Sequence, residues 1–226
     1  MKKRILAIIL LTFMLASLIT PFLVKADENK GPEIKEVPLV FVTDQPATIE
    51  TKGIVETKSL EEIAMDSFYD EMESLESITD KREWFIRYKC IIEKYADIVD
   101  PPESIYDYFD EEELDLLFKV VQAEIGDSDD FIQKVNVVNV IFNRLKHERF
   151  SNALSEILVS DQFSTISNGR YKKVEVTEDT ILACEYAFII EDTTDGCLFF
   201  DSNETLNYKP VFEDGAHNFY KYWKEN

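Results

Sequence analysis

The chain has 226 residues and a formal net charge of −21 at pH 7, from 45 acidic and 24 basic side chains. Nucleic acids bind to clustered Lys and Arg, so this charge argues against nucleic acid as a partner. With only two His and three Cys, the sequence predicts no metal site, no disulfide scaffold and no other cofactor.

The first 26 residues are typical of an export signal. Basic residues at positions 2–4 precede an apolar run over positions 5–24, and small side chains precede the predicted cleavage site after Ala26. This run is longer than the roughly 7–15 residues of an ordinary signal core, so an uncleaved N-terminal anchor is the alternative. We therefore expect a secreted protein.

Residues 27–79 are acidic, contain three prolines and show little hydrophobic periodicity, which predicts a flexible spacer. Within it, Ser59 and Glu62 have the spacing of a capping box and predict the start of a weak helix.

A stronger helix is expected from Asp80 up to the proline pair at 101–102, which ends it. We treat residues 80–104 as a helical lead-in to the main domain, residues 105–226. The first helix of that domain is expected to follow Asp110, because three glutamates come directly after it and suit a helix N-terminus.

The stretch "KVVQAEIGDS", residues 119–128, directs a carboxylate towards the core. Val120, Val121 and Glu124 lie on one helix face, and Gly126 is expected to end the helix. A buried, unpaired carboxylate costs several kcal/mol, on the order-of-magnitude rule, unless it stays protonated or finds hydrogen-bond donors. A carboxyl group kept protonated by an apolar setting is what a general acid requires, so Glu124 is the candidate catalytic residue.

The next predicted helix, residues 130–146, has apolar side chains all round and is expected to be central and buried. Asn136, Asn139 and Asn143 interrupt this pattern at positions i, i+3 and i+7. Buried amides need hydrogen-bond partners, either in neighbouring structure or in a wet cleft.

The chain after residue 146 is expected to form short helices, loops and strands. Ser151 is expected to cap a short helix, residues 160–173 to form a loop turning at Gly169, and Thr177 to cap an amphipathic helix. A buried strand is expected within residues 196–203 and a terminal strand within 215–223, packing Phe219 and Trp223. Four or five helices with two or three short strands predict an α+β fold, mostly helical. Cys184 and Cys197 are expected to be buried thiols, with a disulfide between them as the alternative.

Other chemistries are poorly supported. No HExxH spacing accompanies the two histidines, and Cys197, which precedes His217, lies in the apolar stretch "GCLFF". Glycoside cleavage usually employs a second carboxylate. The candidates for this second carboxylate are Asp127, Asp129, Asp130 and Asp161. None of them has the apolar setting of Glu124. One glutamate is sufficient if a hydroxyl of the sugar itself is the nucleophile.

From about Leu114 to Trp223 the sequence resembles the cell-wall hydrolase family of spore-forming bacteria, the spore-cortex-lytic enzymes of SleB/CwlJ type. Four blocks carry the resemblance in order: "LLFKVVQAEIGD", "KVNVVNVIFNRLKHERFSNALSEIL", "DQFSTISNGR", and "GCLFF" followed by "GAHNFYKYW". The resemblance implies a compact lysozyme-like catalytic domain that acts on peptidoglycan glycan strands, with Glu124 as the general acid. The family commonly has a second Glu four residues later, where this chain has Ser128.

Together, residues and resemblance predict a lytic transglycosylase that cleaves between N-acetylmuramic acid and N-acetylglucosamine. Gln162 and Ser164 are expected to hydrogen-bond the sugar with Phe163 packed behind them, and Asn143 and His217 to line the same cleft. The alternatives are an N-acetylmuramoyl-L-alanine amidase and a non-catalytic wall-binding or assembly protein.

No peptidoglycan-binding repeat precedes the catalytic part. Residues 27–110 are therefore expected to serve as a tether, a regulator or a site for a protein partner. The predicted location is the cell wall or the spore envelope. Vegetative wall and spore cortex both stay open as substrates, and the sequence indicates no oligomeric state.

Overall fold

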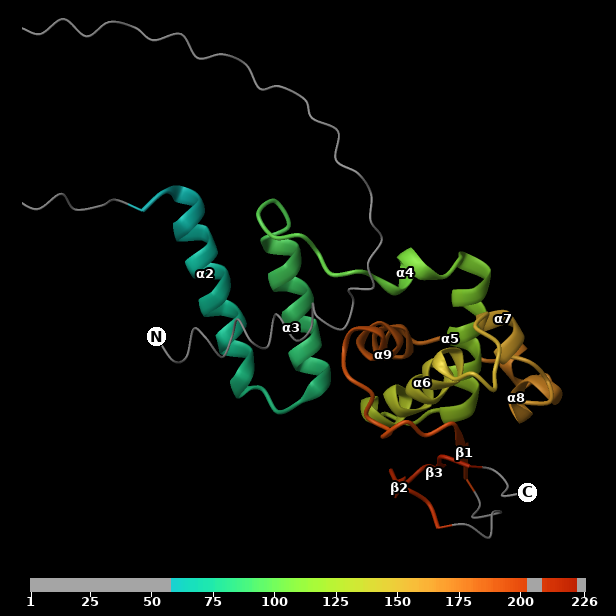
Figure 1. Ribbon diagram of the computed structural model, residues 1–226. Helices are drawn as coiled ribbons and strands as arrows, with labels where there is room; N and C mark the ends of the chain where they lie inside the picture. The colour runs from blue at the N-terminus through green and yellow to red at the C-terminus, as the bar shows by residue number, and fades with distance from the viewer. Residues whose placement is uncertain (1–57, 203–208, 223–226) are drawn as a thin grey trace, which may run out of the picture. The chain divides into compact units, whose positions relative to one another are not determined.

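The computed structural model describes residues 58–202 and 209–222 (Figure 1). The predicted export signal, most of the predicted spacer and Trp223 lie outside the described residues. The chain divides into two compact units, residues 1–73 and 74–226. No described helix is both long enough and apolar enough to span a membrane.

In the first unit, the described element is α2 (Leu60–Ser74), which ends at the boundary. The predicted capping box is present. The backbone N–H of Glu62 donates to the Ser59 hydroxyl at 3.1 Å, and the Ser59 N–H donates to the Glu62 carboxylate at 2.7 Å. The weak helix expected from Ser59 is confirmed.

The second unit is built from four longer helices: α3 (Lys81–Lys94), α5 (Glu111–Ile125), α6 (Phe131–Lys146) and α9 (Glu178–Ile189). Three of the predicted N-caps are confirmed, because Asp80, Asp110 and Thr177 each accept a hydrogen bond from a backbone N–H in the first turn. The predicted end of α3 was wrong. The chain leaves the helix at Tyr95 and continues as a turn, so the prolines at 101–102 lie beyond the helix end.

Helix α6 is the centre of this unit, as predicted. It packs against both α5 and α9 and lies between them (Figure 1). Val135, Val138 and Ile141 have no exposed surface. Asp130 begins the helix by accepting hydrogen bonds from the N–H groups of Ile132 and Gln133. A helix with apolar side chains on all faces reaches full burial only where neighbours cover it on several sides.

Short elements complete the second unit. The helical ones are η1 (Leu75–Ser77), α4 (Ile105–Tyr108), α7 (Leu154–Ile157), α8 (Ser164–Ser167) and η2 (Arg170–Lys172). The helix expected to be capped by Ser151 begins later, at Leu154, because the Ser151 hydroxyl accepts from the Ala153 N–H and forms a turn before the helix.

Three strands form one antiparallel sheet of order β1-β3-β2: β1 (Phe199–Asp201), β2 (Phe212–Glu213) and β3 (Asn218–Tyr220). Phe219, on the central strand, is fully buried against Val140 of α6 and Cys197. Both predicted strands are present, and the mostly helical α+β fold with a small sheet is confirmed.

Cys184 and Cys197 are separate buried thiols, and burial raises the pKa of Cys197 to about 12.

The asparagine row on α6 binds the segment that follows α9. Asn136 donates to Asp214 at 2.9 Å and accepts from Thr193 at 2.7 Å, while Asn139 donates to Thr193 at 2.8 Å. Asn143 donates to the Asp192 carboxylate, the Thr194 hydroxyl and the Cys197 carbonyl at 3.0–3.1 Å. The amides therefore hold the chain that leads into the sheet.

Candidate active site around Glu124

Glu124 lies in the last turn of α5, one residue before the helix ends. Gly126 closes the helix with a backbone φ of 66°, a conformation that disfavours residues with a side chain. The predicted helix end is therefore confirmed. Glu124 is half-buried, and its Oε1 accepts a hydrogen bond of 2.5 Å from the Thr165 hydroxyl.

The setting of Glu124 favours a protonated carboxyl group. Partial burial raises the pKa of Glu124, and this effect outweighs the hydrogen bond from Thr165 and the positive charges of Arg170 and Arg144, which lower it. A carboxyl group with a raised pKa keeps its proton at a higher pH than an exposed one. A raised pKa is what a general acid requires, and the role of Glu124 as that acid stays a prediction.

Thr165 comes from a segment that was expected to be a loop. Ser164–Ser167 instead form the short helix α8, and the N–H groups of Ser167 and Asn168 donate to the carbonyls of Phe163 and Ser164. Four helical residues are too few to show a 3.6-residue period, which is why the sequence did not indicate a helix. Gly169 turns the chain with φ 73°, as predicted.

The side chains of this segment alternate between inside and outside. Phe163 and Thr165 are buried, whereas Gln162 and Ser164 are exposed. The two predicted sugar-binding side chains therefore alternate along the chain with the buried Phe163 and with Thr165, which bonds Glu124. Thr165 itself was not predicted, although its spacing of two from the apolar Phe163 was a usable signal.

Arg144 also was not predicted. It lies in the last turn of α6 with 4% of its surface exposed, and its Nε donates to the Leu198 carbonyl at 2.7 Å. Burial lowers the pKa of Arg144 to about 10, and the negative charge of Glu124 opposes this change. The guanidinium therefore stays charged at neutral pH and acts on Glu124.

None of the other predicted carboxylates shares the setting of Glu124. Asp127, Asp129, Asp130 and Asp161 are exposed, and Asp130 is engaged as the N-cap of α6. Ser128, at the position of the second family glutamate, donates through its hydroxyl to Gln133 at 2.6 Å. Within the described ranges, the site has one carboxyl group with a raised pKa.

Asn143 and His217 are not joined to Glu124 by any hydrogen bond among the described residues. The Asn143 amide is engaged by the 192–197 segment, as described above. The His217 ring is buried 4.9 Å from the Phe200 ring, and its Nδ1 has no hydrogen-bond partner in the part of the chain described. Burial lowers the pKa of His217, so the ring is neutral at a lower pH than an exposed one. Their predicted role in sugar binding stays a prediction.

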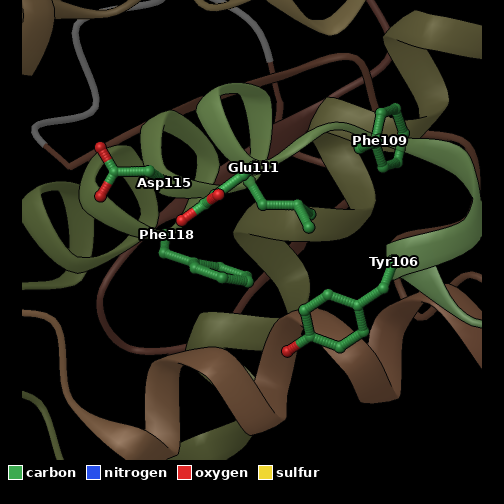
Figure 2. Close-up of a pocket in the computed structure, with 6 residues that line it drawn as sticks. Tyr106, Phe109, Glu111, Asp115 and Phe118 are labelled. Carbon is green, nitrogen blue, oxygen red and sulfur yellow. The ribbon is translucent and has the colours of Figure 1, made fainter.

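A hollow of about 360 Å³ lies elsewhere in the second unit. Its lining residues are Tyr106, Phe109, Glu111, Leu114, Asp115 and Phe118 (Figure 2). None of them is a predicted site residue, so this hollow is separate from the candidate site. In the described residues, no group of three or more His, Cys, Asp or Glu side chains is placed to hold a metal ion.

The described residues form a small, mostly helical α+β domain in which burial raises the pKa of the half-buried Glu124. Residues 128–222 match the family model of the cell wall hydrolases. This segment is a cell wall hydrolase domain, and the resemblance to that family is confirmed for it; the first of the four blocks lies before the matched residues. The matched segment begins four residues after Glu124, so the match itself does not test the role of Glu124.

Two solved structures are similar to the chain. The catalytic domain of the SleB protein from Bacillus cereus has 22% sequence identity and a TM-score of 0.44, covering 50% of this chain and 92% of its own. The catalytic domain of a germination-specific lytic transglycosylase, SleB from Bacillus anthracis, has 20% identity and a TM-score of 0.45, covering 52% of this chain and 100% of its own. A search of curated proteins gave no significant match.

Proposed function

We propose that the chain is an exported lytic transglycosylase of peptidoglycan, with Glu124 as its single catalytic carboxyl group. The observation that carries this proposal is that Glu124 is half-buried with a raised pKa. The other candidate carboxylates, Asp127, Asp129, Asp130 and Asp161, are all exposed. The membership of residues 128–222 in the cell-wall hydrolases supports peptidoglycan as the substrate.

The proposed reaction requires one acid and no activated water. Glu124 delivers its proton to the oxygen between N-acetylmuramic acid and N-acetylglucosamine, and the bond from that oxygen to the anomeric carbon breaks. The C6 hydroxyl of the same muramic acid attacks the anomeric carbon and returns its proton to the Glu124 carboxylate. Intramolecular attack is favoured because the hydroxyl is already close to the reacting carbon. The product is a 1,6-anhydro sugar.

Thr165 and its neighbours have defined roles in this proposal. The Thr165 hydroxyl occupies Oε1 of Glu124, so Oε2 is the oxygen left to carry the transferable proton. The exposed side chains of Gln162 and Ser164 bind the sugar, with the buried Phe163 packed between them. Asn143 and His217 are secondary candidates for sugar contacts. Export places the enzyme at the cell wall or spore envelope, and residues 27–110 are the proposed region for a protein partner.

Mass spectrometry of muropeptides released from purified sacculi tests the proposal. We expect products lighter by one water than hydrolysed ones and resistant to borohydride reduction. Glu124→Gln, which is nearly isosteric, is expected to abolish release at unchanged circular dichroism. The matched controls Asp127→Asn and Asp161→Asn are expected to retain it. Fully reducible products that depend on Asp127 or Asp161 would make the chain a muramidase instead.

The two alternatives give different results in the same experiment. An amidase releases stem peptides, and its activity is lost on treatment with a strong chelator and restored by zinc. A non-catalytic wall-binding protein sediments with sacculi and releases nothing, before or after the Glu124→Gln change. We expect the chelator to leave the rate of muropeptide release unchanged.

A further inference from the structure

Arg144 is a buried cation that forms no ion pair with a carboxylate in the described part of the chain. Within the described residues no Asp or Glu oxygen lies within 4 Å of its nitrogens, its Nε bonds a neutral carbonyl, and its Nη1 is buried without a hydrogen-bond partner. Burying a charged group without a paired counter-charge carries a large desolvation penalty. Methionine or leucine would fill the same volume without that penalty.

Three aromatic rings surround the guanidinium and fix its place. The Cζ of Arg144 lies 5.0 Å from the ring centre of Phe163, 5.3 Å from that of Phe199 and 5.4 Å from that of Phe150. Each contact is within the range of a cation–π interaction. With the bond from Nε to the Leu198 carbonyl, these rings hold the charge in one position. Specific contacts therefore hold the guanidinium in place, although packing alone would not require a charged side chain at this position.

The Arg144 guanidinium packs against the segment that holds Glu124, because it lies on the Phe163 ring and Thr165 of the same segment bonds Glu124. Glu124 is the negative group that raises the pKa of Arg144, and Arg144 is in turn one of two cations that lower the pKa of Glu124. The other is Arg170 on η2, which is exposed and therefore screened by salt, whereas the buried Arg144 is screened much less. Phe163, one of the three rings, lies two residues before Thr165, which bonds Glu124.

Other charged groups near these helices are engaged or exposed. On α9, Asp179 pairs with Arg82 and Lys134, and Glu185 pairs with Lys89. The remaining charged side chains on the elements that pack against α5 are exposed: Lys146 on α6, Glu156 on α7, Lys172 on η2 and Glu178 on α9.

We propose that Arg144 is the positioning residue of the Glu124 site, where its fixed charge stabilises the carboxylate that Glu124 becomes on giving up its proton. This inference rests on the proposed function. It adds the group that adjusts the pKa of the catalytic acid. A fixed charge directed at a site where charge develops needs no reorganisation during the reaction. Burial raises the pKa of Glu124, and Arg144 opposes this rise, which makes the proton easier to release.

The first test is a carbon NMR titration of the Glu124 carboxyl group in the resting full chain, assigned with Glu124→Gln. In Arg144→Met we expect the midpoint to rise by about half a pH unit or more, as for loss of a nearby opposite charge. Arg144→Lys keeps the charge and is expected to stay near the wild-type midpoint. A folded Arg144→Met protein with the wild-type midpoint would overturn the proposal.

The second test needs no change at Arg144 and stands if Arg144→Met does not fold. The Nε–H resonance of Arg144, buried and bonded to Leu198, is followed through the same titration in the wild type. We expect it to shift with the midpoint of Glu124 and to stay constant in Glu124→Gln. A resonance that is constant in the wild type would show that the two groups are not coupled.

Neither titration uses substrate, so both are independent of whether the proposed reaction is correct. The link to catalysis comes from the pH dependence of kcat for muropeptide release. In Arg144→Met its upper limb should move by the same amount as the NMR midpoint. A lower kcat with an unmoved limb would make Arg144 a structural residue only.

Discussion

At the scale of single residues, the Glu124 carboxyl lowers the stability of the folded chain when it ionises. The pKa of Glu124 in the folded protein lies above its ordinary value of 4.5 because of burial. The folded state then binds more protons than the unfolded state over the interval between the two values. The contribution of Glu124 to the unfolding free energy is therefore complete below pH 4.5 and is lost as the pH rises through the folded-state pKa.

We accordingly expect Glu124→Gln to stabilise the protein at neutral pH. The difference in unfolding free energy between the variant and the wild type should grow from pH 4.5 upward and become constant above the folded-state pKa. Urea unfolding at a series of pH values measures it. Glu156→Gln, at an exposed position on α7, is the control and should show no such trend. A difference that is independent of pH would contradict the raised pKa.

Thr165→Val should raise the pKa of Glu124 further. The Thr165 hydroxyl donates to Oε1 and stabilises the ionised carboxylate, so its removal favours the protonated form. A hydrogen bond to a charged group contributes about 1.5–3 kcal/mol, and one pKa unit is about 1.4 kcal/mol, so we expect an upward move of about one to two pH units. The upper limb of the pH–rate profile for muropeptide release measures this. Ser167→Ala, on the same helix, should leave the limb in place, and equal profiles for both variants would exclude the role of Thr165.

At the scale of elements, the sequence predicted the long helices and their starts because those depend on neighbours in the chain. Asp110, Asp130 and Thr177 act as caps within their own first turns, and the apolar pattern of α6 identified the central helix. Short elements were predicted less well. Helix α8 has four residues and the three strands have two or three, so none is long enough to repeat its pattern twice.

The candidate site was predictable in part for the same reason. Glu124 is visible in the sequence because its own helix places it in an apolar stripe. Thr165 and Arg144 act on it from positions 41 and 20 residues away. Such contacts depend on how α5, α6 and α8 pack together, and no local pattern encodes that packing.

Asn143 offers a test of whether the asparagine row is structural or binds sugar. Its amide donates to Asp192, Thr194 and the Cys197 carbonyl, and hydrogen bonds hold the pKa of Asp192 low against the effect of burial, which raises it. Asn143→Ala should lower the unfolding free energy by about 1–3 kcal/mol, because buried acceptors lose their donor. Asn143→Asp should lower it more, because two carboxylates would then face each other.

Denaturant unfolding measures both variants, with the exposed Asn152→Ala as the control. The effect of Asn143→Asp should shrink on acidification, as one of the two carboxylates takes up a proton. If Asn143 mainly binds sugar, as the sequence predicted, Asn143→Ala instead raises KM and leaves the stability unchanged.

At the scale of the whole molecule, the second compact unit begins at Ser74, whereas the sequence predicted a catalytic domain from residue 105 with a separate lead-in over residues 80–104. Helix α3 supports the structural boundary. Phe85 has no exposed surface and packs edge-on against Tyr186 of α9 at 5.3 Å, and Lys89 pairs with Glu185 at 2.5 Å. The helix thereby covers one side of α9.

Two truncated proteins distinguish these boundaries. Residues 74–226 should unfold cooperatively and release muropeptides from soluble glycan fragments as the full chain does, since they contain the complete second unit. Residues 105–226 lack α3 and leave Tyr186 uncovered. Truncating one buried Phe alone costs about 3–5 kcal/mol, so we expect this shorter protein to lose at least that much stability. Phe85→Ala in residues 74–226 is the matched control, and it should lose part of the stability that the shorter protein loses. Equal stability of the two truncated proteins would restore the predicted boundary at 105, and aggregation of residues 74–226 would make the preceding spacer part of the folded domain.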